Sequence, residues 1–319
     1  MNKRLSIGQI DCIYIAASTY DARFTRICVA SIRYFYPDVP IRLLAGGCLV
    51  PGLAEEMRNH WDVQLADLPR RDYGWGFVKL EPLFGPPGER FLVLDSDTVI
   101  TGPVLDLAAE HYEDFVVDDE DQSPERAKQI YYDYVKAAEE GFPIPKPAFL
   151  FNSGQWFGRS GILRREDFGG LVDWGFPPKL ARPGVFKNGE QGVLNFVVNE
   201  QWRAGKIRVA RIPLMRWPGH GMHGLDAESL AKRASPALVV HWAGMKKARQ
   251  RDMVSADLLA FFEQEYYRRL PAGGVRRLYV GCRDAWSQCL RSVRVRVSLA
   301  LRNKVVLRLF PQHPAKLVK

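Results

Sequence analysis

The N-terminal part of the chain alternates between short apolar runs and longer amphipathic stretches. The apolar runs are rich in β-branched residues, as buried strands are, and the amphipathic stretches repeat at helical spacing. This pattern predicts strands at 11–17, 41–47 and 63–68 and helices at 23–35 and 51–60, with Pro37 ending the first helix. The β-α-β-α-β alternation predicts a parallel, doubly wound sheet.

The alternation continues with less regular spacing. Strands are expected at 91–97, 114–121, 149–158 and 237–244, and helices at 76–84, 124–139, 164–174, 189–199 and 255–269. The first two of these strands end in acidic residues, and the third is interrupted by a polar residue, Asn152. No Gly-x-Gly-x-x-Gly follows the first strand, so the usual dinucleotide fingerprint is missing.

The sharpest local feature is Asp95-Ser96-Asp97, which follows the apolar run Phe-Leu-Val-Leu. Two carboxylates at one strand end can reach a single hard cation, which prefers oxygen ligands and can also bind diphosphate oxygens. In open α/β sheets, ligands bind beyond the carboxyl ends of the strands. The alternative interpretation is a charged turn, because Asp and Ser favour turns.

Three other segments carry candidate chemistry. In the segment 237–247 an apolar strand leads to His241, which can complete a metal site, and Lys247 can pair with phosphate. The alternative there is a core histidine beside a solvated basic turn. Asn152 marks either a functional break or a bulge. Glu190 and Gln191 mark either a site or an ordinary helix start.

Taken together and in order, these segments resemble glycosyltransferase family 8, the family of glycogenin and the bacterial lipopolysaccharide galactosyl- and glucosyltransferases. The resemblance covers roughly residues 11–250. It is carried by AASTYDARF (16–24), VKLEPLF (78–84), VLDSDTVITGPV (93–104), VVDD (116–119), FNSGQWFG (151–158), GEQGVLN (189–195) and HWAGMKK (241–247).

The resemblance implies a GT-A fold, a Rossmann-like mixed sheet flanked by helices. It also implies a metal-dependent hexosyltransferase that uses a UDP-sugar, Mn²⁺ (or Mg²⁺) and a hydroxyl acceptor on a glycan or glycolipid, with retention of configuration. Lipopolysaccharide or cell-surface glycan biosynthesis is the implied setting.

The resemblance also implies a role for each matching residue. It makes Asp95, Asp97 and His241 the metal ligands, and it places Ala17, Ser18, Arg23, Lys79, Ser96, Gly244 and Lys247 at the nucleotide and its diphosphate. It places Asp118 or Asp119, with Asn152, at the donor sugar and Glu190 and Gln191 near the anomeric carbon. Two departures stand out: the family has Asp-Gln where this chain has Glu190-Gln191, and Lys-Pro-Trp where Lys247 is followed by Ala248.

Composition places the chain among soluble globular proteins. Hydrophobic residues make up 47% and charged residues 25%. The five cysteines are odd in number and show no Cys-x-x-Cys spacing, which disfavours a disulfide framework or a zinc site and favours a reducing compartment. Neither a signal peptide nor a transmembrane run is expected. A cytoplasmic enzyme is therefore expected, either free or peripheral on the inner face of the membrane.

The net charge of +9 is concentrated at the C-terminus, where residues 275–319 hold 11 of the 45 Lys and Arg residues and a single acidic residue, Asp284. The balanced remainder disfavours a specific nucleic-acid binder. We therefore expect a GT-A domain over 1–273 and a basic amphipathic extension over 274–319. Residues 285–319 would contact an anionic membrane surface. A solvated extension or a strand packed on the domain are the alternatives.

Two rival functions are considered. One is a nucleotidyltransferase that makes sugar nucleotides, which would also place carboxylates and a metal at a strand end. It usually needs a glycine-rich phosphate loop after the first strand, and AASTYDARF contains no glycine. The other is a non-catalytic, membrane-associated protein whose GT-A-like body only binds nucleotide.

Overall fold

The computed structural model describes residues 9–74, 76–120, 122–245 and 248–282. The chain divides into two compact units, the first ending at Tyr266 and the second beginning at Tyr267. Within the described ranges no helix combines the length and the hydropathy needed to cross a membrane. The predicted membrane-contacting segment, 285–319, lies outside the described residues, as does Lys247.

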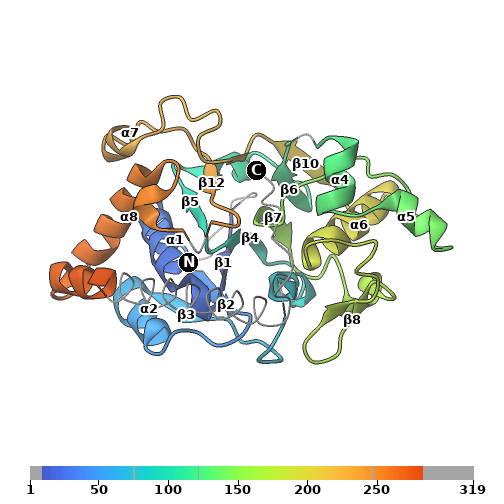
Figure 1. Ribbon diagram of the computed structural model, residues 1–319, viewed down its shortest axis with the longest axis horizontal. Helices are drawn as coiled ribbons and strands as arrows, with labels where there is room; N and C mark the ends of the chain where they lie inside the picture. Colours follow the sequence, from blue (N-terminus) through green and yellow to red (C-terminus); the bar gives the residue numbers. More distant parts are fainter. Residues whose placement is uncertain (1–8, 75, 121, 246–247, 283–319) are drawn as a thin grey trace, which may run out of the picture. The chain divides into compact units, whose positions relative to one another are not determined.

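A seven-stranded mixed sheet forms the centre of the first unit (Figure 1). Its strand order is β10-β6-β7-β4-β1-β2-β3. The strands are β1 (Cys12–Ala17), β2 (Ile41–Ala45), β3 (Val63–Leu65), β4 (Arg90–Asp95), β6 (Phe115–Asp118), β7 (Gln155–Arg159) and β10 (Val209–Ile212). Strands β4, β1, β2 and β3 are mutually parallel, as the alternation predicts. Strand β7 runs antiparallel to β4 and β6 and makes the sheet mixed.

A smaller sheet is attached to the central one through the Asp95-Ser96-Asp97 turn. It has the order β11-β12-β5 and consists of β5 (Thr98–Ile100), β11 (Met215–Arg216) and β12 (Val239–His241). Because β4 ends at Asp95 and β5 begins at Thr98, the acidic turn lies where the chain passes from one sheet to the other. A separate hairpin pairs β8 (Val172–Asp173) with β9 (Lys179–Leu180).

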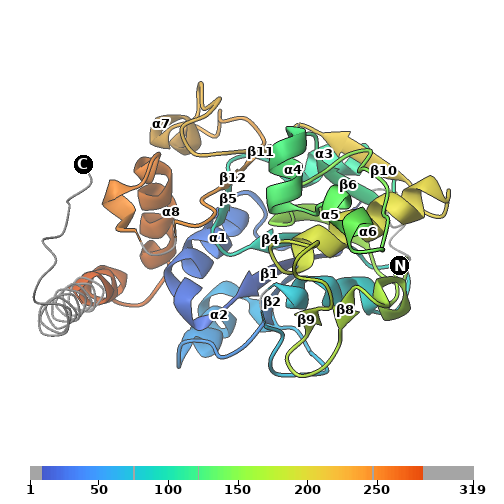
Figure 2. The same cartoon turned by 45° about the vertical axis from the view of Figure 1, so that its right-hand side comes forward.

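Helices flank the central sheet. Helices α1 and α2 lie toward the β1–β3 side, and α4, α5 and α6 gather on the other side (Figures 1 and 2). The α-helices are α1 (Ala22–Phe35), α2 (Leu53–Trp61), α3 (Val104–Ala109), α4 (Pro124–Ile130), α5 (Tyr134–Glu139), α6 (Glu190–Arg203), α7 (Ala227–Ala231) and α8 (Ala256–Arg268). The 3-10 helices are η1 (Thr19–Asp21), η2 (Phe77–Phe84), η3 (Arg165–Phe168) and η4 (Gln250–Asp252).

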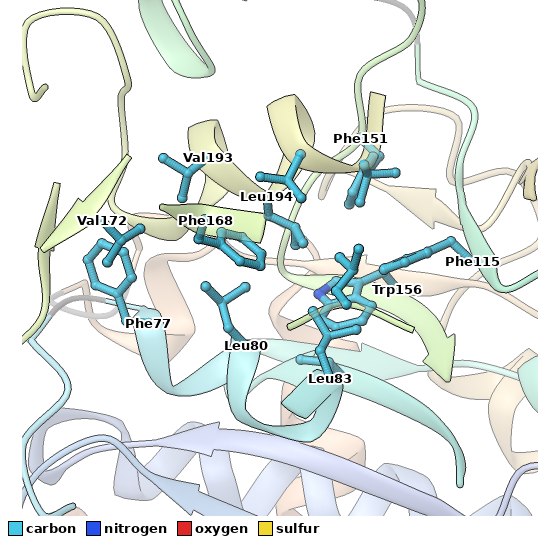
Figure 3. Close-up of a cluster of buried hydrophobic side chains, with 14 of the residues drawn as sticks. Phe77, Leu80, Leu83, Phe115, Phe151, Trp156, Phe168, Val172, Val193 and Leu194 are labelled. Atoms are coloured by element: carbon cyan, nitrogen blue, oxygen red, sulfur yellow. The ribbon is translucent and has the colours of Figure 1, made fainter. Parts of the chain in front are cut away.

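An apolar core fills the space between η2, α6 and the sheet (Figure 3). Leu80 and Leu83 of η2 and Leu194 of α6 are fully buried there, around Trp156 of β7. At about 1.5–3 kcal/mol per buried large side chain, this packing holds α6 and η2 firmly to the sheet. The packing therefore fixes the first turns of η2 and α6 relative to the sheet.

Several predicted elements differ from the structure. The helix expected at 164–174 is wrong. Only η3 forms, because Gly169-Gly170 follows it and Gly170 has a φ of +74°, and the chain then enters β8. The helix expected at 124–139 is two helices, since Asp133 caps α5 by accepting hydrogen bonds from the amides of Val135 and Lys136. The strand expected from 149 begins only at Gln155.

Candidate metal and donor-sugar site

The three predicted metal ligands meet at one point, and strand pairing brings them there. Strands β5 and β12 are antiparallel, with His241 opposite Thr98. The amide of Trp242 donates to the carbonyl of Asp97 at 2.9 Å, which locks the strand end to the acidic turn. Ligand atoms of Asp95, Asp97 and His241 all lie within 4.8 Å of one another. The cluster is therefore built by the junction of the two sheets.

The geometry of the cluster fits a divalent cation. Nε2 of His241 lies 3.4 Å from Oδ1 of Asp97 and 3.8 Å from Oδ2 of Asp95. Two ligands that each lie about 2.1 Å from one ion are separated by about 3–3.5 Å, so small adjustments would close the shell. Two carboxylates and one imidazole form a donor set suited to Mn²⁺ or Mg²⁺. These residues could hold such an ion.

The imidazole is held in place by its surroundings. His241 is 2% exposed, and the ring of Trp217 stacks on it with centroids 5.6 Å apart and an interplanar angle of 20°. On the β7 side, a Cβ at Gly154 would lie 2.3 Å from Cε1 of His241. Nδ1 of His241 has no hydrogen-bond partner among the described residues. Packing from two sides therefore orients Nε2 toward the carboxylates.

Lys79 joins the metal cluster to the start of α6. Its Nζ lies 3.0 Å from Oδ1 of Asp95 and 2.6 Å from Oε1 of Glu190, and it donates to the carbonyl and hydroxyl oxygens of Ser153 at 3.2 Å. Burial by itself would lower the pKa of Lys79, but the two carboxylates outweigh burial and raise the pKa above its usual range. The ammonium therefore stays charged inside the protein.

Glu190 fits into a space that only glycine leaves open. Gly76, which precedes η2, has a φ of +82°, and a Cβ there would lie 1.6 Å from Oε2 of Glu190. The other oxygen of Glu190 accepts the hydroxyl of Ser153 at 2.8 Å. The carboxylate of Glu190 thus lies against the backbone of Gly76 on one side and is paired with Lys79 and Ser153 on the other.

Gln191 and Asn152 lie beside this network. Oε1 of Gln191 accepts the amide of Ser153 at 3.2 Å, and its Nε2 donates to the carbonyl of Ile130 at 3.3 Å. Oδ1 of Asn152 accepts the amide of Gly154 at 2.7 Å, which forms a tight corner before β7. The carbonyl of Gly154 in turn accepts the amide of Asp95. Both predicted residues therefore lie at the junction of β4, β7 and α6.

Asp118 and Asp119 lie in a pocket that adjoins the metal cluster through Trp217. They line a pocket of about 230 Å³ together with Glu120, Met215, Arg216, Trp217, His220 and Gly221. Both carboxylate oxygens of Asp118 accept hydrogen bonds from backbone amides. Oδ1 accepts those of Leu214 and Met215, and Oδ2 accepts that of Glu120. Burial raises the pKa of Asp118 to about 6, although the amides of Met215 and Glu120 act in the opposite direction.

The predicted nucleotide residues lie near the end of β1. Ala17 ends β1, and its neighbour Ala16 pairs with Asp95 of β4. The Ser18 hydroxyl donates to Asp21 at 2.8 Å. Arg23 donates to the carbonyl of Ala248 at 3.3 Å. This hydrogen bond links the first turn of α1 to Ala248, the residue that follows the HWAGMKK segment.

The two remaining predicted residues also flank the cluster. Oγ of Ser96 is buried in the acidic turn without a hydrogen-bond partner in the described ranges. Gly244 has a φ of +78° and lies three residues beyond His241. Such a backbone suits the close approach of a ligand.

Four residues of the site were missed by the sequence analysis: Gly76, Ser153, Trp217 and Glu120. Gly76 and Ser153 contact Glu190, which is remote in the chain, so no local pattern marks them. Trp217 contacts His241 only because β11 and β12 are neighbours. The Trp217 indole donates to Oε1 of Glu120 at 2.6 Å, and Oε2 of Glu120 is buried without a hydrogen-bond partner in the described part of the chain.

Comparison with solved structures finds this architecture in glycosyltransferases. The galactosyltransferase LgtC, solved with donor and acceptor sugar analogs, superposes with a TM-score of 0.51 and 14% identity over 80% of this chain and 95% of its own. An active-site mutant of LgtC superposes with a TM-score of 0.51 and 12% identity, over 79% of this chain and 95% of its own. The bifunctional glycosyltransferase WbbM in its apo form superposes with a TM-score of 0.50 and 14% identity, over 83% of this chain and 50% of its own.

No protein-family model matches the sequence, and comparison with curated proteins gives no match. The fold comparison and the mixed sheet flanked by helices agree with each other. The chain has the fold of the GT-A glycosyltransferases.

Proposed function

We propose that this protein is a metal-dependent glycosyltransferase that moves a hexose from a UDP-sugar to a hydroxyl group of a glycan or glycolipid, with retention of configuration. One observation carries the proposal: Asp95, Asp97 and His241 converge at the carboxyl end of β4, with ligand atoms within 4.8 Å of one another. A fold shared with a galactosyltransferase solved with donor and acceptor sugar analogs supports it.

Each group of residues has a proposed task. Asp95, Asp97 and His241 would hold a divalent cation, which when bound supplies charge stabilisation for a departing diphosphate. Ala17, Ser18 and Arg23 would bind the nucleotide, and Gly244 would let the backbone approach the diphosphate. Glu190, which is linked to Asp95 through Lys79, would lie near the anomeric carbon with Gln191, and Asn152 would lie near the donor sugar. Lys79 orients Asp95 and Glu190 at once.

The arrangement favours direct front-side attack. Oε1 of Glu190 is taken by Lys79 and Ser153, and its Oε2 lies against Gly76, so this carboxylate is held in place. The neighbouring Gln191 is a neutral amide and a poor nucleophile. In the proposed step the bond from the anomeric carbon to UDP breaks while the acceptor oxygen bonds to the same face. The acceptor proton passes to the departing phosphate oxygen.

The pocket beside Trp217 is proposed to hold a sugar, namely the donor sugar that the resemblance places at Asp118 or Asp119. It shares a wall with the metal cluster, because Trp217 stacks on His241 and also lines the pocket. An aromatic face with nearby carboxylate oxygens suits a sugar, whose apolar face packs on the ring while its hydroxyls donate to Asp119 and Glu120.

The test is UDP release by the full-length protein from a panel of UDP-sugars with Mn²⁺, which needs no acceptor. The Asp97→Ala variant should lose Mn²⁺ binding, measured by calorimetry, and metal-dependent turnover. Asp38→Ala is the matched control, because Asp38 is exposed in the loop that precedes β2, at the amino ends of the parallel strands, whereas the cluster lies at their carboxyl ends. Near-normal turnover by Asp97→Ala would reject the proposal. Pyrophosphate release in place of UDP would indicate a nucleotidyltransferase.

A further inference from the structure

The segment 148–153 lies along α6 and is bound to it in an unusual way. Residues 149–152 belong to no strand in the described chain. Alternate backbone groups of the segment 148–153 are instead paired with three amide side chains spaced four residues apart on α6, namely Gln191, Asn195 and Asn199. We call this set the amide ladder.

Each rung of the ladder pairs with alternate residues of the segment. Oδ1 of Asn199 accepts the amide of Ala148 at 2.8 Å, and its Nδ2 donates to the carbonyl of Phe149 at 2.9 Å. Asn195 accepts the amide of Phe151 and donates to its carbonyl, both at 2.9 Å. Oε1 of Gln191 accepts the amide of Ser153 at 3.2 Å.

The ladder works because two repeats match. Four residues of an α-helix advance by about 6 Å. Two residues of an extended chain advance by about 6.6 Å and return the backbone groups to the same side. Amides at every fourth helix position can therefore meet every second residue of the segment. Each asparagine also donates to the carbonyl four residues before it on α6, at 2.9 Å, which fixes its rotamer.

The upper end of the ladder lies in the site. Ser153 contacts Lys79 and Glu190, and Gly154 abuts the ring of His241. Glu190 and Gln191 form the first turn of α6, which the same ladder carries. A slip of α6 along the segment would therefore move Glu190 and Gln191 relative to the metal cluster. Among the three amide side chains, Asn195 pairs with both the amide and the carbonyl of one residue, Phe151, and it lies closer to the site than Asn199 does.

We propose that Asn195 is a positioning residue that sets the register of α6 against the Ser153 corner, and thereby places Gln191 and Glu190 relative to Asp95, Asp97 and His241. Its catalytic consequence rests on the proposed function, whereas its structural consequence does not. Asn199 anchors the far end of the segment. Both asparagines are fully buried and have similar bonds, so they form a matched pair.

The experiment compares Asn195→Ala with Asn199→Ala in the full-length chain. Amide hydrogen exchange is read at Ala148, Phe149, Phe151 and Ser153, and turnover is read as UDP release. We expect Asn199→Ala to speed exchange only at Ala148 and Phe149 and to leave kcat within about twofold. Asn195→Ala should speed exchange at Phe151 and Ser153 and lower kcat roughly tenfold to a hundredfold, because small misplacements at a reacting centre are costly.

The outcomes separate the inference from the proposed function. Equal losses of kcat in the two variants, or an unchanged kcat in Asn195→Ala, would reduce Asn195 to a structural role and overturn the inference. If the wild-type protein releases no UDP, the proposed function fails and the exchange data decide alone: faster exchange at Ser153 in Asn195→Ala supports the inference, and unchanged exchange there overturns it. Asn195→Ser, which keeps a hydroxyl in place, is read by the same criteria if the alanine variant does not fold.

Discussion

A methyl group added at position 154 should weaken metal binding without touching a metal ligand. In Gly154→Ala the new Cβ would lie 2.3 Å from Cε1 of His241, whereas carbon atoms in contact are about 3.5–4.0 Å apart. The ring or the start of β7 must therefore shift by about 1 Å. Metal ligands tolerate only about 0.2 Å.

The expected magnitude follows from this displacement. Loss of correct ligand orientation costs about tenfold to a hundredfold in metal affinity, or about 1.4–2.8 kcal/mol. Calorimetric titration of Mn²⁺ into the wild type and Gly154→Ala measures the difference directly. Turnover at saturating Mn²⁺ should recover in part, since excess metal compensates for weaker binding.

Gly158→Ala, in the strand that follows Gly154, provides the control. Its Cβ would lie 2.6 Å from Cζ3 of Trp156, so it makes a comparable clash in the apolar core. We expect it to lower the free energy of unfolding and to leave the Mn²⁺ affinity unchanged. If the two variants bind Mn²⁺ equally well, the contact between Gly154 and His241 does not orient the imidazole and the reasoning is refuted.

Two further predictions concern Glu190 and Asp118. Gly76→Ala should lower kcat about tenfold or more by displacing Glu190. Gly52→Ala, at a similar φ of +77° but in open space, should share only the backbone strain of about 1 kcal/mol and keep its activity; equal kcat losses would contradict the role of Gly76. The raised pKa of Asp118 means that the folded state binds its proton more tightly than the unfolded chain does. The stability of the wild type relative to Asp118→Asn should therefore fall by about 3 kcal/mol as pH rises from about 3 to about 7, with most of the loss between about 4 and 6, and then level off. Urea unfolding across this range measures it, and a pH-independent difference would argue against a buried, destabilised carboxylate.

The sequence was sufficient for the parts of the site that follow local rules. Asp95 and Asp97 were singled out because an apolar strand ends in acidic residues, and His241 because an apolar strand leads to it; the family resemblance then made all three the predicted metal ligands. Their convergence could not be derived locally, because it depends on the antiparallel pairing of β5 with β12. The helix predicted at 164–174 failed because Gly169-Gly170 ends it, a local signal outweighed by the apolar pattern.

Long-range contacts explain the residues that were missed. The sequence around Ser153 is typical of a strand, yet its side chain contacts Lys79 and the first turn of α6. The extended segment before β7 also looks like a strand, because its amides and carbonyls are paired as in a strand, although by side chains of α6. Hydrophobic periodicity reports which residues are buried, and it does not reveal which partner satisfies the backbone.

The pairing of Lys79 with two carboxylates is better explained by site geometry than by stability. Buried ion pairs often add little to the free energy of folding, because desolvation offsets their attraction. Lys79 contacts Oδ1 of Asp95, while Oδ2 of the same residue faces His241. The ammonium therefore orients the carboxylate of Asp95, with Oδ1 toward Lys79 and Oδ2 toward the imidazole of the cluster.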